Sequence, residues 1–126
     1  MSSSWIKAST RYAIYHRDGF ACVYCLATKA EGVQLTLDHV RPRTRGGSHA
    51  VTNLVTCCTA CNTTRADRSI AAWVTLLVEF GVPAEVAQTI PGRVRAQTAK
   101  PIDRAEGRRL AKAMRTRAWG FAKYVR

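Results

Sequence analysis

Acidic residues and long apolar runs are both scarce in this 126-residue chain. Eight Asp and Glu residues stand against 20 Lys and Arg residues, so the formal net charge is +12. Such an excess in a short chain attracts polyanions, and nucleic acid is a stronger candidate than an acidic membrane surface or a merely basic protein without a polyanionic partner. No apolar run approaches the roughly 20 residues that span a bilayer, so we expect no membrane segment.

A secretory signal is also missing, because the first residues, MSSSWIK, contain no apolar core. We therefore expect a cytoplasmic, intracellular protein. In a reducing compartment, paired cysteines are more often metal ligands than disulfides, and the cysteines of this chain are interpreted in that way.

Basic residues are absent from residues 69–92, which carry two acidic residues and a net charge of −2. Residues 1–68 have a net charge of +5 and residues 93–126 a net charge of +9. This change in composition predicts a soft boundary near residue 69. We expect a core over residues 1–68 and a basic helical extension over residues 69–126 that packs on the core or on nucleic acid.

Local patterns in the first half predict two short strands flanked by helices. Alternation of apolar and polar residues over 33–37 predicts a strand that delivers Asp38 and His39 at its end. The other elements expected in this half are a helix from Ser9 or Thr10 to about Arg17, a strand over 54–57 and a polar helix over 59–68.

The second half predicts helices alone. Ser69 is expected to cap a helix that runs to about Phe80. Pro83 is expected to start a short helix that Pro91-Gly92 stops, and residues 102–118 are expected to form a last helix rich in arginine.

Two Cys-x-x-Cys pairs, Cys22 with Cys25 and Cys58 with Cys61, form the strongest motif of the chain. Each pair can chelate a metal through a tight turn, and four thiolates give the closed tetrahedral environment of a structural zinc ion. Cys57 is the competing ligand, but its spacing to Cys61 has one residue too many for the usual turn. We therefore expect one structural Zn²⁺ per chain, with Cys57 as a small packed residue.

Asp38, His39 and Asn62 lie between or beside the cysteine pairs and match the needs of phosphodiester hydrolysis. A histidine can act as general base near neutral pH, and Asp and Asn oxygens suit Mg²⁺. Taken singly, His39 reads as an ordinary loop histidine, Asn53 as a turn residue and Asn62 as a helix cap. Their joint placement favours a nuclease site.

Four segments resemble the HNH endonucleases, whose fold is the ββα-metal fold. They are Arg17-Asp-Gly-Phe-Ala-Cys-Val-Tyr-Cys25, Leu37-Asp-His-Val-Arg-Pro-Arg-Thr-Arg-Gly-Gly47, Asn53-Leu54 and Cys58-Thr-Ala-Cys-Asn62. The resemblance covers about residues 11–68, slightly under half of the chain. It implies an α+β fold with a small ββα-metal core, a Cys₄ structural zinc site and a helical C-terminal extension.

The resemblance also implies a divalent-metal-dependent DNA endonuclease that nicks DNA or cuts both strands. His39 would be the general base, and Asp38 and Asn62 would hold one catalytic Mg²⁺ or Mn²⁺. Asn53 would bond the loop backbone and so orient His39. The family's products carry 5′-phosphate and 3′-hydroxyl ends.

Arginines around this motif are expected to contact the phosphates of double-stranded DNA, because the guanidinium fork matches phosphate oxygens. Arg65, one turn beyond Asn62, is expected near the scissile or adjacent phosphate. His49 is interpreted as a surface histidine, and the alternatives are that it touches DNA or helps to position the metal loop. The expected DNA-binding residues are Arg41, Arg43, Arg45, Arg65 and Arg68.

The competing interpretation is a non-catalytic, zinc-dependent DNA-binding or accessory module of a DNA-processing assembly. It needs the cysteines and the basic surface but leaves Asp38, His39 and Asn62 without a purpose. The sequence leaves three points undecided. The chain could act with a protein partner or as a homodimer, and it could be a phage-encoded enzyme that acts in a bacterial host. Its target sequence is not predicted.

Overall fold

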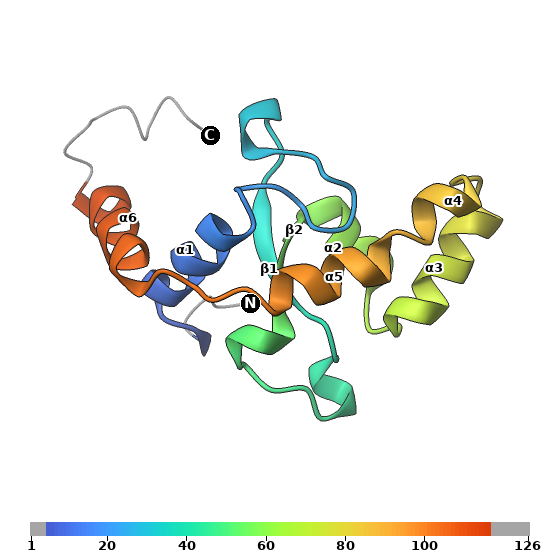
Figure 1. The fold of residues 1–126 in the computed structure, drawn as a ribbon, viewed down its shortest axis with the longest axis horizontal. Helices are drawn as coiled ribbons and strands as arrows, with labels where there is room; N and C mark the ends of the chain where they lie inside the picture. Colours follow the sequence, from blue (N-terminus) through green and yellow to red (C-terminus); the bar gives the residue numbers. More distant parts are fainter. Residues whose placement is uncertain (1–4, 117–126) are drawn as a thin grey trace.

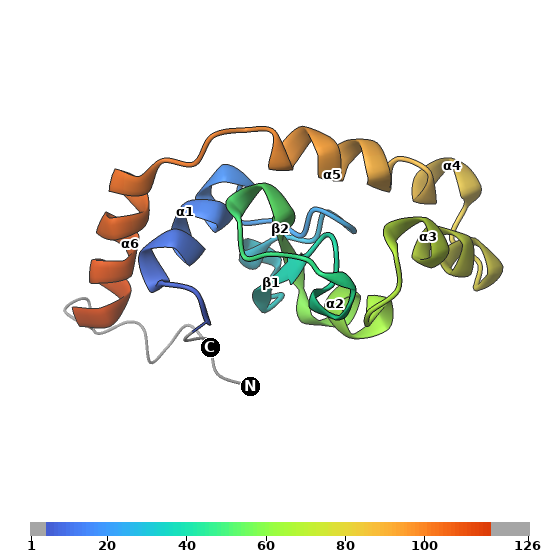
Figure 2. The same cartoon turned by 90° about the horizontal axis from the view of Figure 1, so that it is seen from below.

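The computed structural model of the protein describes residues 5–116. A two-stranded sheet lies between two groups of helices, with α1 and α6 side by side at one end and α3 and α4 at the other (Figures 1 and 2). The elements are α1 (Ala8–Arg17), η2 (Lys29–Glu31), β1 (Leu35–His39), η3 (Arg43–Arg45), η4 (Val51–Asn53), β2 (Leu54–Cys58), α2 (Thr59–Arg65), α3 (Ile70–Glu79), α4 (Ala84–Ala87), α5 (Ile90–Thr98) and α6 (Arg104–Thr116).

The two strands and α2 form the expected ββα unit. β1 pairs antiparallel with β2, so that Leu35 lies opposite Cys58 and His39 lies opposite Leu54. β2 then passes directly into α2, which ends at Arg65 rather than at residue 68. Ala66 ends the helix because its φ of 53° is not helical. The α+β class expected from the sequence is confirmed.

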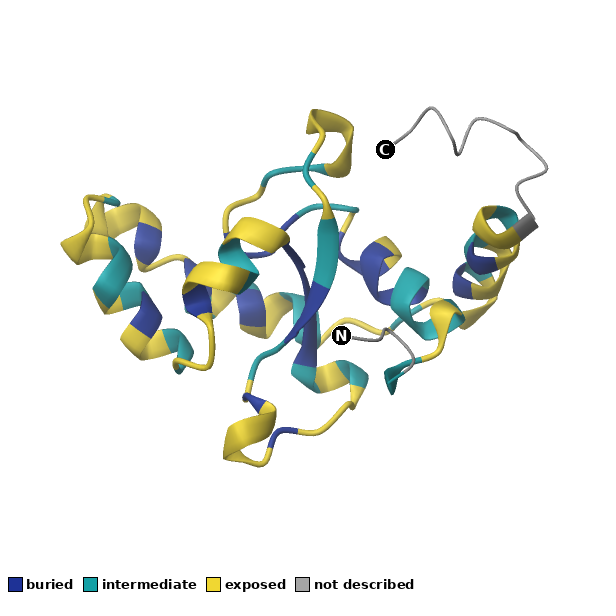
Figure 3. Cartoon of the chain, turned by 180° about the vertical axis from the view of Figure 1, so that it is seen from behind, coloured by how far each residue is buried: buried dark blue, intermediate teal, exposed yellow. Residues whose placement is uncertain are grey.

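The core is built around β2, whose five residues are all buried. Buried residues line both strands and the inner faces of the helices, while the outward helix faces are exposed (Figure 3). One cluster includes Val55, Trp73 and Val94, and a second cluster surrounds Ile14 and Leu54. The sheet therefore separates two small apolar cores instead of covering one.

A buried ion pair joins α1 to the sheet. Arg17 Nε donates to Asp18 Oδ1 at 2.8 Å, and Arg17 Nη2 donates to the Leu54 carbonyl at 2.6 Å. Asp18 Oδ2 in turn accepts the Thr56 backbone N–H at 2.9 Å. Both charges are thus hydrogen-bonded, as buried charges must be, and the C-terminal end of α1 is fixed against β2.

Two details of the helices differ from the sequence expectation. α1 begins at Ala8 after Lys7, which makes no side-chain cap, so neither Ser9 nor Thr10 is the cap. Pro91 and Gly92 do not stop a helix but lie in the first turn of α5. Proline is tolerated there because the first helical N–H groups have no intrahelical partner.

The helices after residue 69 contact the first half of the chain. Ser69 caps α3, as expected, by accepting the Ala72 N–H at 3.1 Å. On α5, the Arg93 guanidinium donates to the carbonyls of Val23 at 2.6 Å and Tyr24 at 2.8 Å. The boundary between residues 68 and 69 stays a prediction, and residues 117–126 of the expected extension lie outside the described residues.

No helix within residues 5–116 has both the length and the apolar character needed to cross a membrane.

Gly107 sets how closely α6 approaches α1. A Cβ at this position would lie 2.2 Å from the Ser9 carbonyl oxygen and 2.7 Å from Ala13 Cβ. We predict that Gly107→Ala lowers the free energy of unfolding by about 1–3 kcal/mol, because the helices must separate. Urea unfolding followed by circular dichroism measures this change.

Gly92→Ala is the matched control. A Cβ at Gly92 would meet only the tip of Arg95, 3.8 Å away, in a helical segment. Removing a helical glycine there is expected to leave stability unchanged or to raise it by up to about 1 kcal/mol. Equal unfolding midpoints for the two variants would show that the helix crossing is not tight.

Candidate active site and metal centre

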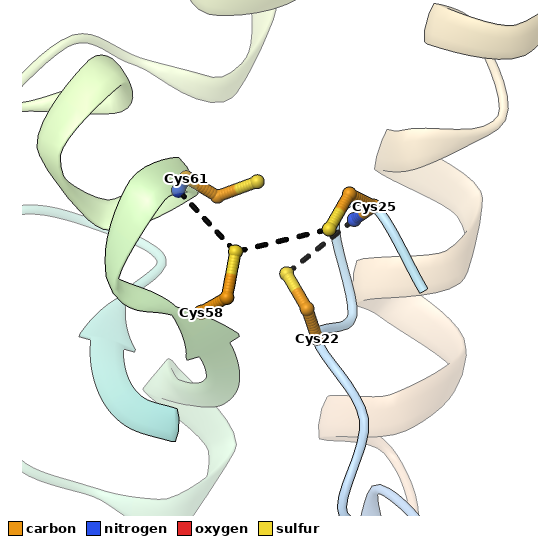
Figure 4. A group of neighbouring side chains, drawn as sticks. All are labelled: Cys22, Cys25, Cys58 and Cys61. Carbon is orange, nitrogen blue, oxygen red and sulfur yellow. Dashed lines mark hydrogen bonds between the residues drawn. The ribbon is translucent and has the colours of Figure 1, made fainter. Parts of the chain in front are cut away.

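The four cysteines of the two pairs lie close together (Figure 4). Cys22 and Cys25 come from the loop after α1, and Cys58 and Cys61 come from the end of β2 and from α2. Their Sγ atoms all lie within 4.8 Å of one another, and Cys25 Sγ lies 3.8 Å from Cys58 Sγ. Each pair closes a tight turn, because the Cys25 N–H donates to Cys22 Sγ and the Cys61 N–H donates to Cys58 Sγ, both at 3.4 Å. The four cysteines are therefore positioned to bind a metal.

This geometry fits zinc. Tetrahedral Zn–S bonds of roughly 2.3 Å place neighbouring sulfurs roughly 3.8 Å apart. A hydrogen bond with Cys61 lowers the pKa of the Cys22 thiol, and the same bond raises the pKa of Cys61. A bound metal would replace the thiol protons and link the two segments.

Cys57 lies outside this group. It is fully buried in β2 opposite Thr36, and burial raises the pKa of its thiol far above the usual range. A thiol so resistant to ionisation suits packing rather than metal binding. The choice of Cys58 over Cys57, which spacing alone left uncertain, agrees with the position of each side chain.

Tyr24, inside the first cysteine pair, reaches the end of β1. Its hydroxyl donates to Asp38 Oδ2 at 2.7 Å, and its ring packs edge-on against Trp73 at 4.9 Å between centroids. Burial raises the Tyr24 pKa well above its usual value, so the phenol remains a donor at neutral pH. The cysteine turn is thereby connected to the aspartate.

The position of Arg65 in the structure differs from the position that the sequence predicted. We expected a phosphate contact, but the side chain is fully buried, with 0% exposed. Its Nη1 donates to Asp38 Oδ2 and to the His39 carbonyl, each at 2.7 Å, and its Nη2 donates to the Val40 carbonyl at 2.6 Å. The expected DNA contact is wrong because these groups already occupy the guanidinium.

Three of the predicted residues, Asp38, His39 and Asn62, line one cavity of about 400 Å³. Asp38 and Asn62 come from different elements, the end of β1 and the first turns of α2. Within residues 5–116, neither Asp38 Oδ1 nor the Asn62 side chain has a hydrogen-bond partner. Two oxygen ligands are therefore available at this wall of the cavity.

Asn53 holds the loop that follows β1. Its Oδ1 accepts the Arg41 N–H at 2.8 Å, and its Nδ2 donates to the carbonyls of Arg41 at 3.2 Å and Ser48 at 2.8 Å. Gly47 is required in the same loop, since a Cβ there would lie 1.7 Å from the Arg41 carbonyl oxygen. These contacts are those expected of Asn53, and its role in orienting His39 stays a prediction.

His39 belongs to a small aromatic cluster. Its Nε2 lies 2.9 Å from His49 Nδ1, and the Trp5 ring packs against both imidazoles, with centroids 4.9 Å and 4.7 Å away. Burial and the neighbouring His49 lower the pKa of His39, which favours the neutral form of the ring. His49, interpreted from sequence as a surface histidine, is exposed but contacts the candidate base directly.

The cavity also contains Arg11, which the sequence analysis did not select. Arg11 Nη1 donates to the Tyr15 hydroxyl at 3.2 Å, and the guanidinium lies 5.5 Å from the Trp5 ring centroid. No carboxylate within residues 5–116 pairs with it. The sequence offered one weak signal, the spacing of Arg11 and Tyr15 by one helical turn.

The remaining arginines of the expected DNA-binding set, Arg41, Arg43, Arg45 and Arg68, are exposed. Arg41 Nε donates to the Arg45 carbonyl at 2.7 Å, and Arg68 Nη1 donates to the Thr64 carbonyl at 2.9 Å. Each keeps further N–H groups for a ligand, and their contacts with DNA stay predictions.

Residues 22–71 match a family model described as HNH endonuclease. The matched segment contains both cysteine pairs and the cavity residues Asp38, His39 and Asn62. The family resemblance drawn from the motifs is confirmed over this segment, and the family indicates nuclease activity. No curated protein and no solved structure matches the chain.

Zinc content tests the assignment of the cysteines. We predict about one zinc ion per chain for the wild type and for Cys57→Ala, and a loss of zinc for Cys58→Ala, because three thiolates hold the ion less tightly. Elemental analysis after dialysis gives the stoichiometry. Retention of zinc by Cys58→Ala together with its loss from Cys57→Ala would reverse the assignment.

Proposed function

Because residues 22–71 match the HNH endonuclease family, we propose that this protein is a divalent-metal-dependent endonuclease that hydrolyses phosphodiester bonds of double-stranded DNA. One observation carries the proposal. Asp38, His39 and Asn62, which have no common purpose in a binding module, line the same cavity although Asn62 lies far from the others in the chain.

The oxygens of Asp38 and Asn62 would hold the catalytic cation. Oxygen ligands suit Mg²⁺ or Mn²⁺, and a cation bound there would neutralise charge on the scissile phosphate and on the departing 3′ oxygen. Tyr24 and Arg65 both donate to Asp38 Oδ2, which leaves Oδ1 without a hydrogen-bond partner among the described residues. Zinc at the four cysteines is structural and takes no part in the chemistry.

His39 is the general base. A neutral imidazole can take the proton of a water molecule, and the lowered pKa of His39 increases the neutral fraction near pH 7. Asn53 acts as a positioning residue, because its three hydrogen bonds hold the loop that returns to the sheet beside Val40.

Arg11 provides the cation that Arg65 was expected to provide. The tyrosine hydroxyl and the tryptophan ring hold its guanidinium in place, and no carboxylate of the described residues neutralises its charge. A preorganised guanidinium in a cavity with the metal ligands is suited to bind the non-bridging oxygens of the scissile phosphate.

The exposed basic residues would hold the flanking duplex. Four exposed arginines flank the cavity residues along the sequence: Arg41, Arg43, Arg45 and Arg68. Residues 93–126 add a net charge of +9. One active cavity cuts one strand at a time. A single chain therefore nicks DNA, and a double-strand break needs a second copy or a second event.

We predict that purified protein with Mg²⁺ or Mn²⁺ converts supercoiled plasmid to the open-circle form. His39→Ala should lower the rate by about 10²- to 10⁴-fold, since it removes the base. His16→Ala is the matched control, because His16 is an exposed histidine on α1 outside the cavity. Gel electrophoresis of timed samples gives both rates.

Two outcomes would contradict this assignment. Equal cutting by His39→Ala and wild type would remove His39 from the chemistry. Plasmid binding without conversion, with every common divalent ion, would identify the chain as a non-catalytic DNA-binding module.

We predict that Arg11→Gln lowers the single-turnover rate at saturating DNA by roughly 10- to 100-fold, because a charge-assisted contact to the reacting phosphate is lost. DNA affinity should change little. The control is Arg95→Gln, which removes an exposed arginine of α5 that does not line the cavity. The same rate loss in both variants would show that total charge matters and not the position of Arg11.

A further inference from the structure

Three side chains, Arg43, His49 and His39, form a hydrogen-bonded row that ends at the cavity residue His39. His39 Nε2 lies 2.9 Å from His49 Nδ1, and His49 Nε2 lies 3.1 Å from Arg43 Nη1. Arg43 and His49 are exposed, and both come from the loop that follows β1. The Trp5 ring packs on the two imidazoles and keeps them in contact.

The arginine determines the direction of every hydrogen bond in this row. A guanidinium has donors and no acceptor, so His49 Nε2 must accept from Arg43. A neutral His49 then carries its proton on Nδ1 and donates it to His39 Nε2. His39 Nε2 must therefore accept, which places the proton of the neutral His39 on Nδ1.

This direction leaves the candidate base without a free lone pair. The Nε2 lone pair of His39 is occupied by the His49 N–H, and its Nδ1 carries a proton. Neither ring nitrogen of His39 can take a proton from water while Arg43 donates to His49. The conclusion is the same whichever nitrogen acts in catalysis.

We propose that Arg43 and His49 hold His39 in a resting form and that a DNA phosphate releases it by drawing Arg43 away from His49. The charge-assisted bond from guanidinium to phosphate is stronger than the bond from guanidinium to a neutral imidazole. Once Arg43 has left, His49 can carry its proton on Nε2 and accept from His39 Nε2–H. His39 then has a free lone pair on Nδ1, and no proton is gained or lost by the pair.

Binding of the duplex is thereby coupled to the ability of His39 to accept a proton from water. This inference depends on the proposed function, since it assigns a resting state to the base of that reaction. It makes His49 a positioning residue, which acts only through His39, and it gives Arg43 a second role beside phosphate binding.

The test is a nitrogen-15 NMR spectrum of the histidine rings in the zinc-loaded 126-residue chain without Mg²⁺ or Mn²⁺. The chain has three histidines, so His16→Gln and His49→Gln spectra assign all of them. We expect free wild-type protein to show protonated Nδ1 and unprotonated Nε2 in both His39 and His49. A 16-base-pair duplex should shift both rings toward the form with the proton on Nε2.

Arg43→Gln should cause the same shift without DNA. The change in the tautomer ratio should be on the order of two- to tenfold, the range that one exposed hydrogen bond produces. Arg45→Gln is the matched control, because it removes the same charge from the same short helix while its Nε contacts the Asp67 carbonyl and not His49. It should leave the tautomers of the free protein unchanged.

The proposal is overturned if His39 already carries its proton on Nε2 in the free protein. It is equally overturned if Arg43→Gln and Arg45→Gln give the same spectra, or if DNA binds without shifting either ring. These readouts require no cleavage, so they separate failure of the resting-state proposal from failure of the nuclease proposal, which the plasmid assay decides.

Discussion

Asp38 Oδ2 is the atom on which the candidate site depends. It accepts the Tyr24 hydroxyl from the first cysteine turn and Arg65 Nη1 from α2, each at 2.7 Å. The same arginine donates to the His39 carbonyl, so one guanidinium fixes two successive residues of β1. Removing Arg65 would leave the Asp38 carboxylate without its ion-pair partner, at a cost of about 3–5 kcal/mol. The first cysteine turn, α2 and the cavity are thus connected through one carboxylate.

The site depends on these contacts because the two-stranded sheet is not stable by itself. Two strands of five residues form no independently stable unit, and the apolar residues divide into two small clusters. The chain compensates with the buried pair of Arg17 and Asp18, which bonds to the β2 backbone, and with the four-cysteine group at the end of β2. A bound zinc ion would add on the order of 10 kcal/mol of folding free energy at that point. A metal bound there would therefore stabilise the segments that also form the cavity.

Predictions from the sequence were most reliable for features that depend on short spacings along the chain. The cysteine pairs, the strand before Asp38 and the ββα order follow from local rules, and the structure and the family match agree with them. Local rules failed for Arg65, whose type and position suggested a phosphate contact. A buried carboxylate attracts an arginine as strongly as a phosphate does, and a linear pattern contains no information about which is closer. Pro91 was misjudged for a related reason, because proline both follows and begins helices.

The amino-acid sequence by itself determined the four-cysteine group, the basic character and the presence of Asp38, His39 and Asn62, because residue types and short spacings encode these features directly. The tertiary structure alone decided which arginine is buried and which enters the cavity. It also decided that Trp5, Arg11 and His49 belong to the site. Their contacts join residues from α1, the loop after β1 and the first described residue. Only the packing of the folded chain, which depends on contacts between distant segments, brings such residues together.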